Sequence, residues 1–178
     1  ARELGLEHLT RPQFLAKLLN DAQRSVAVGG TSGKSTVTGM IGWILHATHR
    51  QPTVMNGAVM KNFATPSAPF ASALVGDPEL FVSEVDESDG SIALYRPSLG
   101  VLLNVSLDHK SMEELRHLFG DFLAVSKARA VAAHMRARGY AREECIAVGD
   151  SREDLDVAEV VGRLFLVANA VAGFTLAI

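Results

Sequence analysis

Apolar positions along the chain follow two spacings, one typical of strands and one typical of helices. Short apolar runs predict buried strands at residues 25–28, 53–55, 80–83, 101–103, 145–148 and 164–167. Apolar residues spaced three and four positions apart predict helices at residues 12–20, 34–49, 112–138 and 155–161. Alternating strands and helices predict an α/β fold with three layers, a mostly parallel sheet with helices on both faces. We expect a single α/β domain over residues 1–178.

Polar residues gather where the predicted strands end. Four such clusters follow strands, at residues 30–36, 84–89, 104–109 and 150–154. In open parallel sheets, ligands bind beyond the carboxyl ends of the strands. The pattern therefore predicts a ligand site at this edge of the sheet.

Composition and charge exclude several classes of protein. The chain has 178 residues, of which 48% are hydrophobic, and its net charge is -3, so nothing indicates a nucleic-acid partner. No stretch without charges is longer than Leu164–Ile178, which is shorter than the roughly 18 residues of a membrane span, and we expect no membrane contact. The single cysteine, Cys145, forms no internal disulfide and fits a cytoplasmic location. Because the chain begins with Ala1, we expect it to be a fragment.

The cluster after the first predicted strand has the spacing of a phosphate-binding loop. It reads Gly30-Thr31-Ser32-Gly33-Lys34-Ser35-Thr36. Its glycines let backbone N–H groups converge, the next helix adds its positive dipole end, Lys34 supplies a mobile cation and the Ser35 hydroxyl suits magnesium. The general P-loop pattern has glycine where this chain has Val28. The alternative is a glycine-rich turn capped by a serine, but a position between strand and helix favours a P-loop-like nucleotide site.

The other clusters leave alternatives open. The run from Glu84 to Asp89 places four carboxylates just past a strand. One or two of them would suffice for magnesium, but a solvated acidic loop that caps the next helix is an equal alternative. The pair Asp108-His109, which follows Asn104, is a weak signal alone. We interpret Lys127, in the long helix, as a solvated surface residue.

Three stretches together resemble a known family. Residues 25–40, 81–92 and 103–110 are similar to the central domain of Mur ligases, whose shortened loop, Gly-x-x-Gly-Lys-Ser/Thr-Thr, accommodates Val28. The Glu84–Asp89 and Asn104–His109 stretches most resemble the branch that handles UDP-N-acetylmuramate, which contains alanine-adding and peptide-recycling ligases. Asn56-Gly57 with Asn62-Phe63 is similar to a loop of that branch. The resemblance covers about residues 1–130.

The resemblance implies ATP-dependent amide-bond formation through an acyl phosphate. Carried over to this chain, Lys34 would hold the β- and γ-phosphates of ATP, and Asn104 would line the catalytic cleft. Ser35 and Glu84 would bind one Mg²⁺ and His109 a second. The implied partners are a nucleotide and a UDP-muramyl-type substrate. The N-terminal UDP-binding domain and the C-terminal domain of such ligases are missing from the chain, so we expect nucleotide binding with little turnover.

Residues 131–178 predict a strand-helix-strand unit of a different kind. Residues 139–169 resemble the last motif of haloacid-dehalogenase-type phosphatases, in which Asp150 and Asp154 would bind magnesium and Lys127 would touch the phosphoryl group. That family needs an Asp-x-Asp nucleophile, and Asp86 and Asp89 lack this spacing. We therefore predict no phosphatase activity and interpret Asp150 and Ser151 as a helix cap.

Two resemblances in one chain suggest a chimera or a rearranged gene. A strand-helix-strand unit can complete the sheet of another α/β fold, because both obey the same crossover rule. The alternatives to a ligase core are a magnesium-dependent phosphatase remnant and an inactive engineered folding scaffold.

Overall fold

A mostly parallel five-stranded sheet forms the centre of the protein. The computed structural model describes residues 7–106, 110–149 and 152–166. The strand order is β3 (Ala73–Leu74), β2 (Pro52–Met55), β4 (Asp77–Glu84), β1 (Arg24–Gly29) and β5 (Leu99–Leu102). Only β3 runs antiparallel to its neighbour. The predicted sheet is thereby confirmed, and β1 occupies an interior position with parallel neighbours on both sides.

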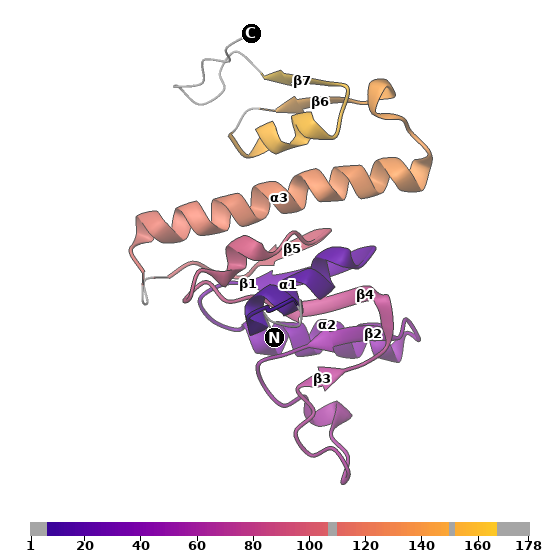
Figure 1. Ribbon diagram of the computed structural model, residues 1–178, viewed down its shortest axis with the longest axis vertical. Coiled ribbons are helices and arrows are strands. Elements are labelled where there is room, and N and C mark those ends of the chain that lie inside the picture. The colour runs from indigo at the N-terminus through magenta and orange to yellow at the C-terminus, as the bar shows by residue number, and fades with distance from the viewer. Residues whose placement is uncertain (1–6, 107–109, 150–151, 167–178) are drawn as a thin grey trace.

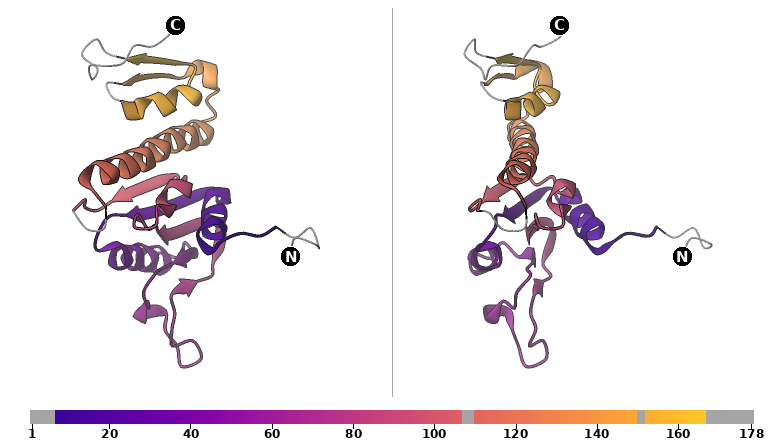
Figure 2. Two further views of the ribbon diagram at one scale, coloured as in Figure 1. Left: turned by 60° about the vertical axis from the view of Figure 1, so that its left-hand side comes forward. Right: turned by 90° about the vertical axis from the view of Figure 1, so that its left-hand side faces the viewer.

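Helices cover both faces of this sheet. On one face, α1 (Arg11–Asp21), the 3₁₀ helix η3 (Ser91–Leu94) and α3 (Met112–Arg138) pack on Ala27 and Phe81. On the other face, α2 (Lys34–Ala47) supplies residues that pack around Val54 and Val82. Figure 2, right, shows α1 and α2 on opposite sides of the strands. Neighbouring residues of β4, Phe81 and Val82, thus point to opposite faces of the sheet and pack in different cores, as in any pleated strand. The predicted three-layer arrangement is confirmed.

The long helix α3 has sequence-coded ends. At its start, Ser111 and Glu114 form a capping box, in which each side chain satisfies a backbone N–H of the other. At its end, Gly139 adopts a φ of 70°, a left-handed conformation that glycine enters without steric cost. Both limits agree with the predicted helix over residues 112–138.

The C-terminal unit forms a second small sheet instead of extending the first. Strands β6 (Ile146–Gly149) and β7 (Arg163–Leu166) pair in parallel, and α3 lies between them and the five-stranded sheet (Figure 1). The connecting segment is a 3₁₀ helix, η5 (Arg152–Glu159), where the apolar spacing predicts a helix at 155–161. A separate core explains this placement. Val157 and Val161 of the C-terminal unit pack with Ala128 and Met135, which lie in the second half of α3.

Four short elements were not predicted. These are β3 and the 3₁₀ helices η2 (Lys61–Phe63), η3 and η4 (Arg142–Glu144). Each spans two to four residues, too few for an apolar period to appear.

Arg129 ties α3 to the end of α1. Its guanidinium donates to the carbonyl oxygens of Asn20 at 2.6 Å and Ala22 at 3.1 Å, and also to the carbonyl of Arg96. The Asn20 side chain accepts from the Arg96 N–H at 2.7 Å and donates to the Leu94 carbonyl at 2.9 Å. Desolvation by burial lowers the pKa of Arg129 from its ordinary value. A planar, multiply donating cation thus satisfies carbonyls that the helix end leaves unpaired.

We expect Arg129→Lys to lower the free energy of unfolding by about 1–2 kcal/mol, because an ammonium cannot reproduce the planar fork that reaches several carbonyls. Urea denaturation measures the change. Arg116→Lys is the matched control, since Arg116 is exposed on the same helix. Equal stability of the two variants would contradict this role.

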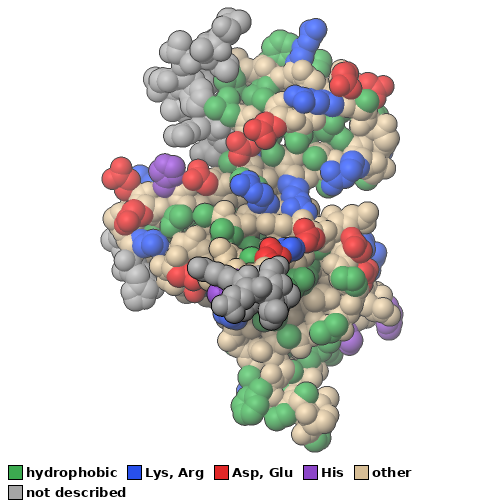
Figure 3. Space-filling view, viewed as in Figure 1, with side chains coloured by type: hydrophobic (Ala, Val, Ile, Leu, Met, Phe, Trp, Pro, Cys, Tyr) green, Lys and Arg blue, Asp and Glu red, His purple; other side chains and the backbone are tan. Residues whose placement is uncertain are grey.

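Charged side chains are mixed across the surface. Figure 3 shows acidic and basic side chains interspersed on the face in view, with apolar ones in small groups. Within the described residues, no helix combines the length and apolar character that crossing a membrane requires.

Candidate phosphate-binding site

The glycine-rich loop leaves the sheet at the carboxyl end of β1. Leu103 donates its N–H to the carbonyl of Gly29 at 3.1 Å, which ties the start of the loop to the segment after β5. Gly30 has a φ of 134°, and a Cβ at this position would lie 3.2 Å from the backbone N and O of Asn104. Glycine is therefore required here by both backbone conformation and close approach. The loop sits at the strand ends, where the sequence predicts the ligand site.

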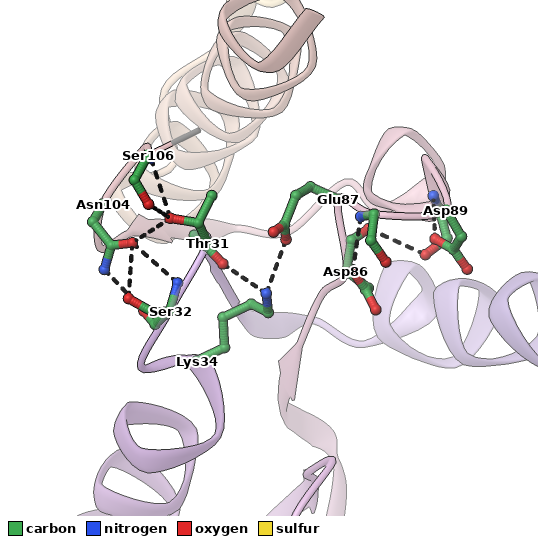
Figure 4. Close-up of polar contacts among 11 residues, drawn as sticks. Thr31, Ser32, Lys34, Asp86, Glu87, Asp89, Asn104 and Ser106 are labelled. Atoms are coloured by element: carbon green, nitrogen blue, oxygen red, sulfur yellow. Dashed lines mark hydrogen bonds and ion pairs between the residues drawn. The ribbon is translucent and has the colours of Figure 1, made fainter. Parts of the chain in front are cut away.

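The Asn104 side chain holds the loop in shape (Figure 4). Its Oδ1 accepts hydrogen bonds from the Thr31 hydroxyl at 2.7 Å and the Ser32 N–H at 3.0 Å, while its Nδ2 donates to the Ser32 carbonyl at 2.9 Å. The Thr31 hydroxyl also lies 2.7 Å from the Ser106 hydroxyl. Asn104 therefore lies against the loop, and its contacts there order the backbone of the loop.

The N-terminus of α2 points its free N–H groups into the loop. Gly33 is the N-cap residue, with a φ of 84°, and no side chain of the described residues caps this helix end. The first N–H groups of a helix have no intrahelical acceptor, and the helix dipole adds positive potential there. An uncapped helix start behind a glycine loop is an arrangement suited to an anion.

Lys34 is held at the base of the loop. Its Nζ donates to the Gly30 carbonyl at 2.7 Å and to Oε2 of Glu87 at 2.9 Å (Figure 4). The Lys34 side chain is 18% exposed and that of Glu87 is 7% exposed. The ammonium is thus fixed beside the helix N-terminus by two acceptors, on a side chain that is mostly but not fully buried.

The acidic stretch after β4 divides into two kinds of carboxylate. Asp86 and Asp89 are exposed, and each accepts a hydrogen bond of 2.8 Å from a backbone N–H two residues later. The hydrogen bond from the Ser91 side chain is the largest cause that lowers the pKa of Asp89. Glu84 and Glu87 instead turn inward. The interpretation as a solvated, capping loop fits Asp86 and Asp89, while magnesium binding by this stretch stays a prediction.

Unpaired oxygens around Glu84 suit a hard cation. Oε2 of Glu84 and Oδ1 of Asn56 are buried without a hydrogen-bond partner in the described structure. Asn56 Nδ2 donates to the Ser35 carbonyl at 3.0 Å, and a Cβ at Gly57 would lie 1.9 Å from Oε1 of Glu84. The Asn56-Gly57 turn thus lies against both the Ser35 turn of α2 and Glu84. Among the described residues no group of three or more His, Cys, Asp or Glu is placed to hold a metal ion, but magnesium fits one carboxylate with hydroxyl, phosphate and water oxygens.

Other predicted site residues lie elsewhere. Asp108 and His109 fall outside the described residues, as do Asp150 and Ser151. The prediction that Lys127 is solvated holds only in part, because its half-exposed side chain contacts Asp154 of η5 on the side of α3 away from the sheet (Figure 1). That contact joins the two residues that the phosphatase resemblance had paired.

Two contributions to the site were missed by sequence reasoning. Glu87 was one of four similar carboxylates, and Asn56 was noted only within a loop that resembles one of the UDP-N-acetylmuramate branch, without a role in the site. The register of β4 between β1 and β2 decides which carboxylates face the loop. Such register is a tertiary property that the local pattern does not contain.

The fold and the site together place the chain in a class of protein, the α/β domains that carry a glycine-rich loop on an interior parallel strand. Within that class, the sequence profile of the Mur ligase middle domain matches residues 28–144, more than half of the chain. The chain therefore belongs to the Mur ligase family. The match reaches the end of η4, somewhat beyond the limit of about residue 130 expected from the motifs.

Curated relatives agree with this family. The chain is 47% identical over 109 residues to a UDP-N-acetylmuramate–L-alanine ligase of Clavibacter michiganensis, which covers 61% of this chain and 21% of the relative. It is 33% identical over 126 residues to the ligase of the same name from Agathobacter rectalis, with 68% and 26% covered. The chain thus spans about a quarter or less of the length of these relatives.

Solved structures show the same fold. A UDP-N-acetylmuramate:L-alanyl-gamma-D-glutamyl-meso-diaminopimelate ligase from Neisseria meningitides superposes with a TM-score of 0.56 and 21% identity, over 93% of this chain and 52% of that one. The UDP-N-acetylmuramate-alanine ligase of Thermotoga maritima gives a TM-score of 0.53 and 22% identity, over 87% and 31%.

Proposed function

We propose that this chain is the ATP-binding core of a Mur-type ligase of the UDP-N-acetylmuramate branch, and that the Gly30–Thr36 loop holds the phosphates of ATP. The observation that carries the proposal is the convergence of Lys34 Nζ and the uncapped start of α2 on one glycine loop. A triphosphate meets both a cation and unpaired N–H donors there, which is the chemistry that phosphate groups require.

Individual residues take distinct roles in this proposal. Lys34 contacts the terminal phosphates, and Asn104 keeps Thr31 and Ser32 in the shape that exposes the backbone N–H groups. The Ser35 hydroxyl and the Glu84 carboxylate are the ligands for Mg²⁺, with His109 assigned to a second ion from the resemblance alone. Bound magnesium would offset phosphate charge in the transferring group.

The reaction we propose for the complete ligase is amide-bond formation. The substrate carboxylate becomes an acyl phosphate, which an amine then attacks with loss of phosphate. Such phosphoryl transfer depends on positioning and on charge neutralisation, both of which the loop supplies. This chain spans about a quarter or less of those relatives, and the role that we propose for its own residues is nucleotide binding. A cytoplasmic location and a UDP-muramyl-type substrate follow from the same family.

We expect Gly57→Ala to weaken ATP binding about tenfold in excess magnesium and to leave it unchanged in EDTA. The added Cβ would lie 1.9 Å from Oε1 of Glu84, so the carboxylate must move from its position. Fluorescence titration with ATP measures both affinities.

Gly120→Ala is the matched control for this test. A Cβ at Gly120, in α3, meets nothing within 4 Å, and its ATP affinity should equal that of the unmodified chain. Unchanged affinity of Gly57→Ala in magnesium would refute the role of Glu84 as a metal ligand. An equal loss with and without magnesium would do the same, because it would reveal general damage to the site.

A further inference from the structure

Glu87 is the buried counterion of the loop lysine. Its Oε2 lies 2.9 Å from Lys34 Nζ, and the carboxylate side chain is 7% exposed. Glu87 follows β4, whereas Lys34 begins α2, so the pair joins the two segments that frame the loop (Figure 4). A buried carboxylate in contact with a lysine cancels most of the positive charge that the lysine presents.

Three more carboxylates come from the same stretch as Glu87, but they lie in a different cavity from the Lys34–Glu87 pair. Glu84, Asp86 and Asp89 come from the same stretch and line one cavity of about 230 Å³, together with Arg11. The charge of Lys110 also contributes to the lowered pKa of Asp89. Since Glu87 offsets Lys34, the pair gives the phosphate site little net positive charge. Attraction for an anion then comes from the N–H groups at the start of α2 together with direct contact by the Lys34 ammonium.

The geometry lets Lys34 contact a phosphate without leaving Glu87. A lysine ammonium has three N–H donors, and within the described structure Gly30 and Glu87 accept two of them. The third donor remains for a phosphate oxygen. The Glu87 carboxylate therefore stays beside the nucleotide in the bound state and repels its negative charge.

We propose that Glu87 is a specificity-determining positioning residue, which makes the loop accept ATP as its magnesium complex and reject the metal-free nucleotide. The inference rests on the proposed binding of ATP to this loop. Metal-free ATP brings its full negative charge against Glu87, whereas the divalent cation in the complex offsets much of that charge. Glu87 thus acts through Lys34 and through repulsion, without a bond to the substrate.

The test compares ATP affinity in excess magnesium with ATP affinity in EDTA, measured by titration calorimetry on the full chain. We expect Glu87→Gln to tighten the binding of metal-free ATP about tenfold, because it removes one nearby, poorly hydrated negative charge. The affinity for magnesium-ATP should change much less. Glu87→Asp keeps the charge and should keep the preference for the magnesium complex. Glu143→Gln makes the same substitution at an exposed position of η4 and should change neither affinity.

Each outcome decides the question. If Glu87→Gln does not fold, Glu87→Ala removes the same charge and carries the same expectation. An unchanged ratio of the two affinities in a folded variant would overturn the role of Glu87 while the loop remains a nucleotide site. Weaker binding of both nucleotide forms would overturn it too, because Glu87 would then serve only to order Lys34. Failure of the unmodified chain to bind magnesium-ATP would overturn the proposed function itself, and this inference with it.

Discussion

Lys34→Ala is expected to weaken the binding of magnesium-ATP by about 100-fold or more. This is the size of loss typical when one partner of a buried charge pair is removed. The Lys34 ammonium is held beside the Gly30 carbonyl at the start of α2, where no other cationic side chain contacts the loop among the described residues. Removing it also leaves the Glu87 carboxylate buried without its cation, which adds repulsion toward phosphate. Titration calorimetry measures the loss.

Lys17→Ala is the control for this result. Lys17 is an exposed residue of α1 that pairs with Glu7, so its loss changes the net charge equally without altering the loop. Its affinity for magnesium-ATP should match that of the unmodified chain. If Lys34→Ala bound magnesium-ATP as tightly as the unmodified chain does, the proposal that this loop binds the phosphates of ATP would be wrong.

Phe119→Ala is expected to lower the free energy of unfolding by about 3–5 kcal/mol. Phe119 is 2% exposed and belongs to the core that joins α1, β1, β4, η3 and α3. Its ring also lies beneath Gly29, with Cε1 at 3.7 Å from the position of a Cβ there. Truncation would therefore open a cavity under the start of the loop, and we expect weaker ATP binding as well. Urea denaturation monitored by circular dichroism measures the stability.

Phe70→Ala makes the same substitution at a residue that is 84% exposed. It should cost less than about 1 kcal/mol, because little apolar surface is removed from the interior. If Phe119→Ala were no more destabilising than Phe70→Ala, the core assigned to α3 and the sheet would be wrong.

Much of the fold was predictable because its elements carry strong local patterns. The runs around Val26 and Val82 indicated buried strands, and Gly139 marked the end of α3. The order of the strands was not encoded locally, since the position of β1 between β4 and β5 depends on pairings between distant segments. The separate sheet of β6 and β7 was equally unpredictable, because it results from the packing of Val157 and Val161 on α3.

The candidate site shows the same division. The spacing of glycines around Lys34 identified the loop, since this backbone shape requires glycine at fixed positions. The partners of the loop were less visible. Asn104 was predicted to line the cleft, but its hydrogen bonds to Thr31 and Ser32 depend on how β5 pairs with β1. The inward turn of Glu87 likewise depends on the register of β4.

The chain combines a family match with a C-terminal unit that the match does not include. The match to the Mur ligase profile ends at residue 144, before β6. The helix α3, which lies within the match, contacts both β5 of the large sheet and η5 of the C-terminal unit. Arg129 contacts the end of α1 from within this shared helix. Our expectation of no phosphatase activity from the C-terminal unit stays a prediction.

The central claim is that the Gly30–Thr36 loop binds the phosphates of ATP. Amide NMR spectra of the isotope-labelled chain, recorded during addition of magnesium-ATP, test this claim most directly. The account predicts that the amide signals of Gly33, Lys34, Ser35 and Thr36 shift most, because their N–H groups face the phosphates. The signals of Gly139 and Gly162, near the C-terminal unit, should stay in place. Shifts confined to the C-terminal unit, or none at the loop when ATP is in excess, would contradict the claim.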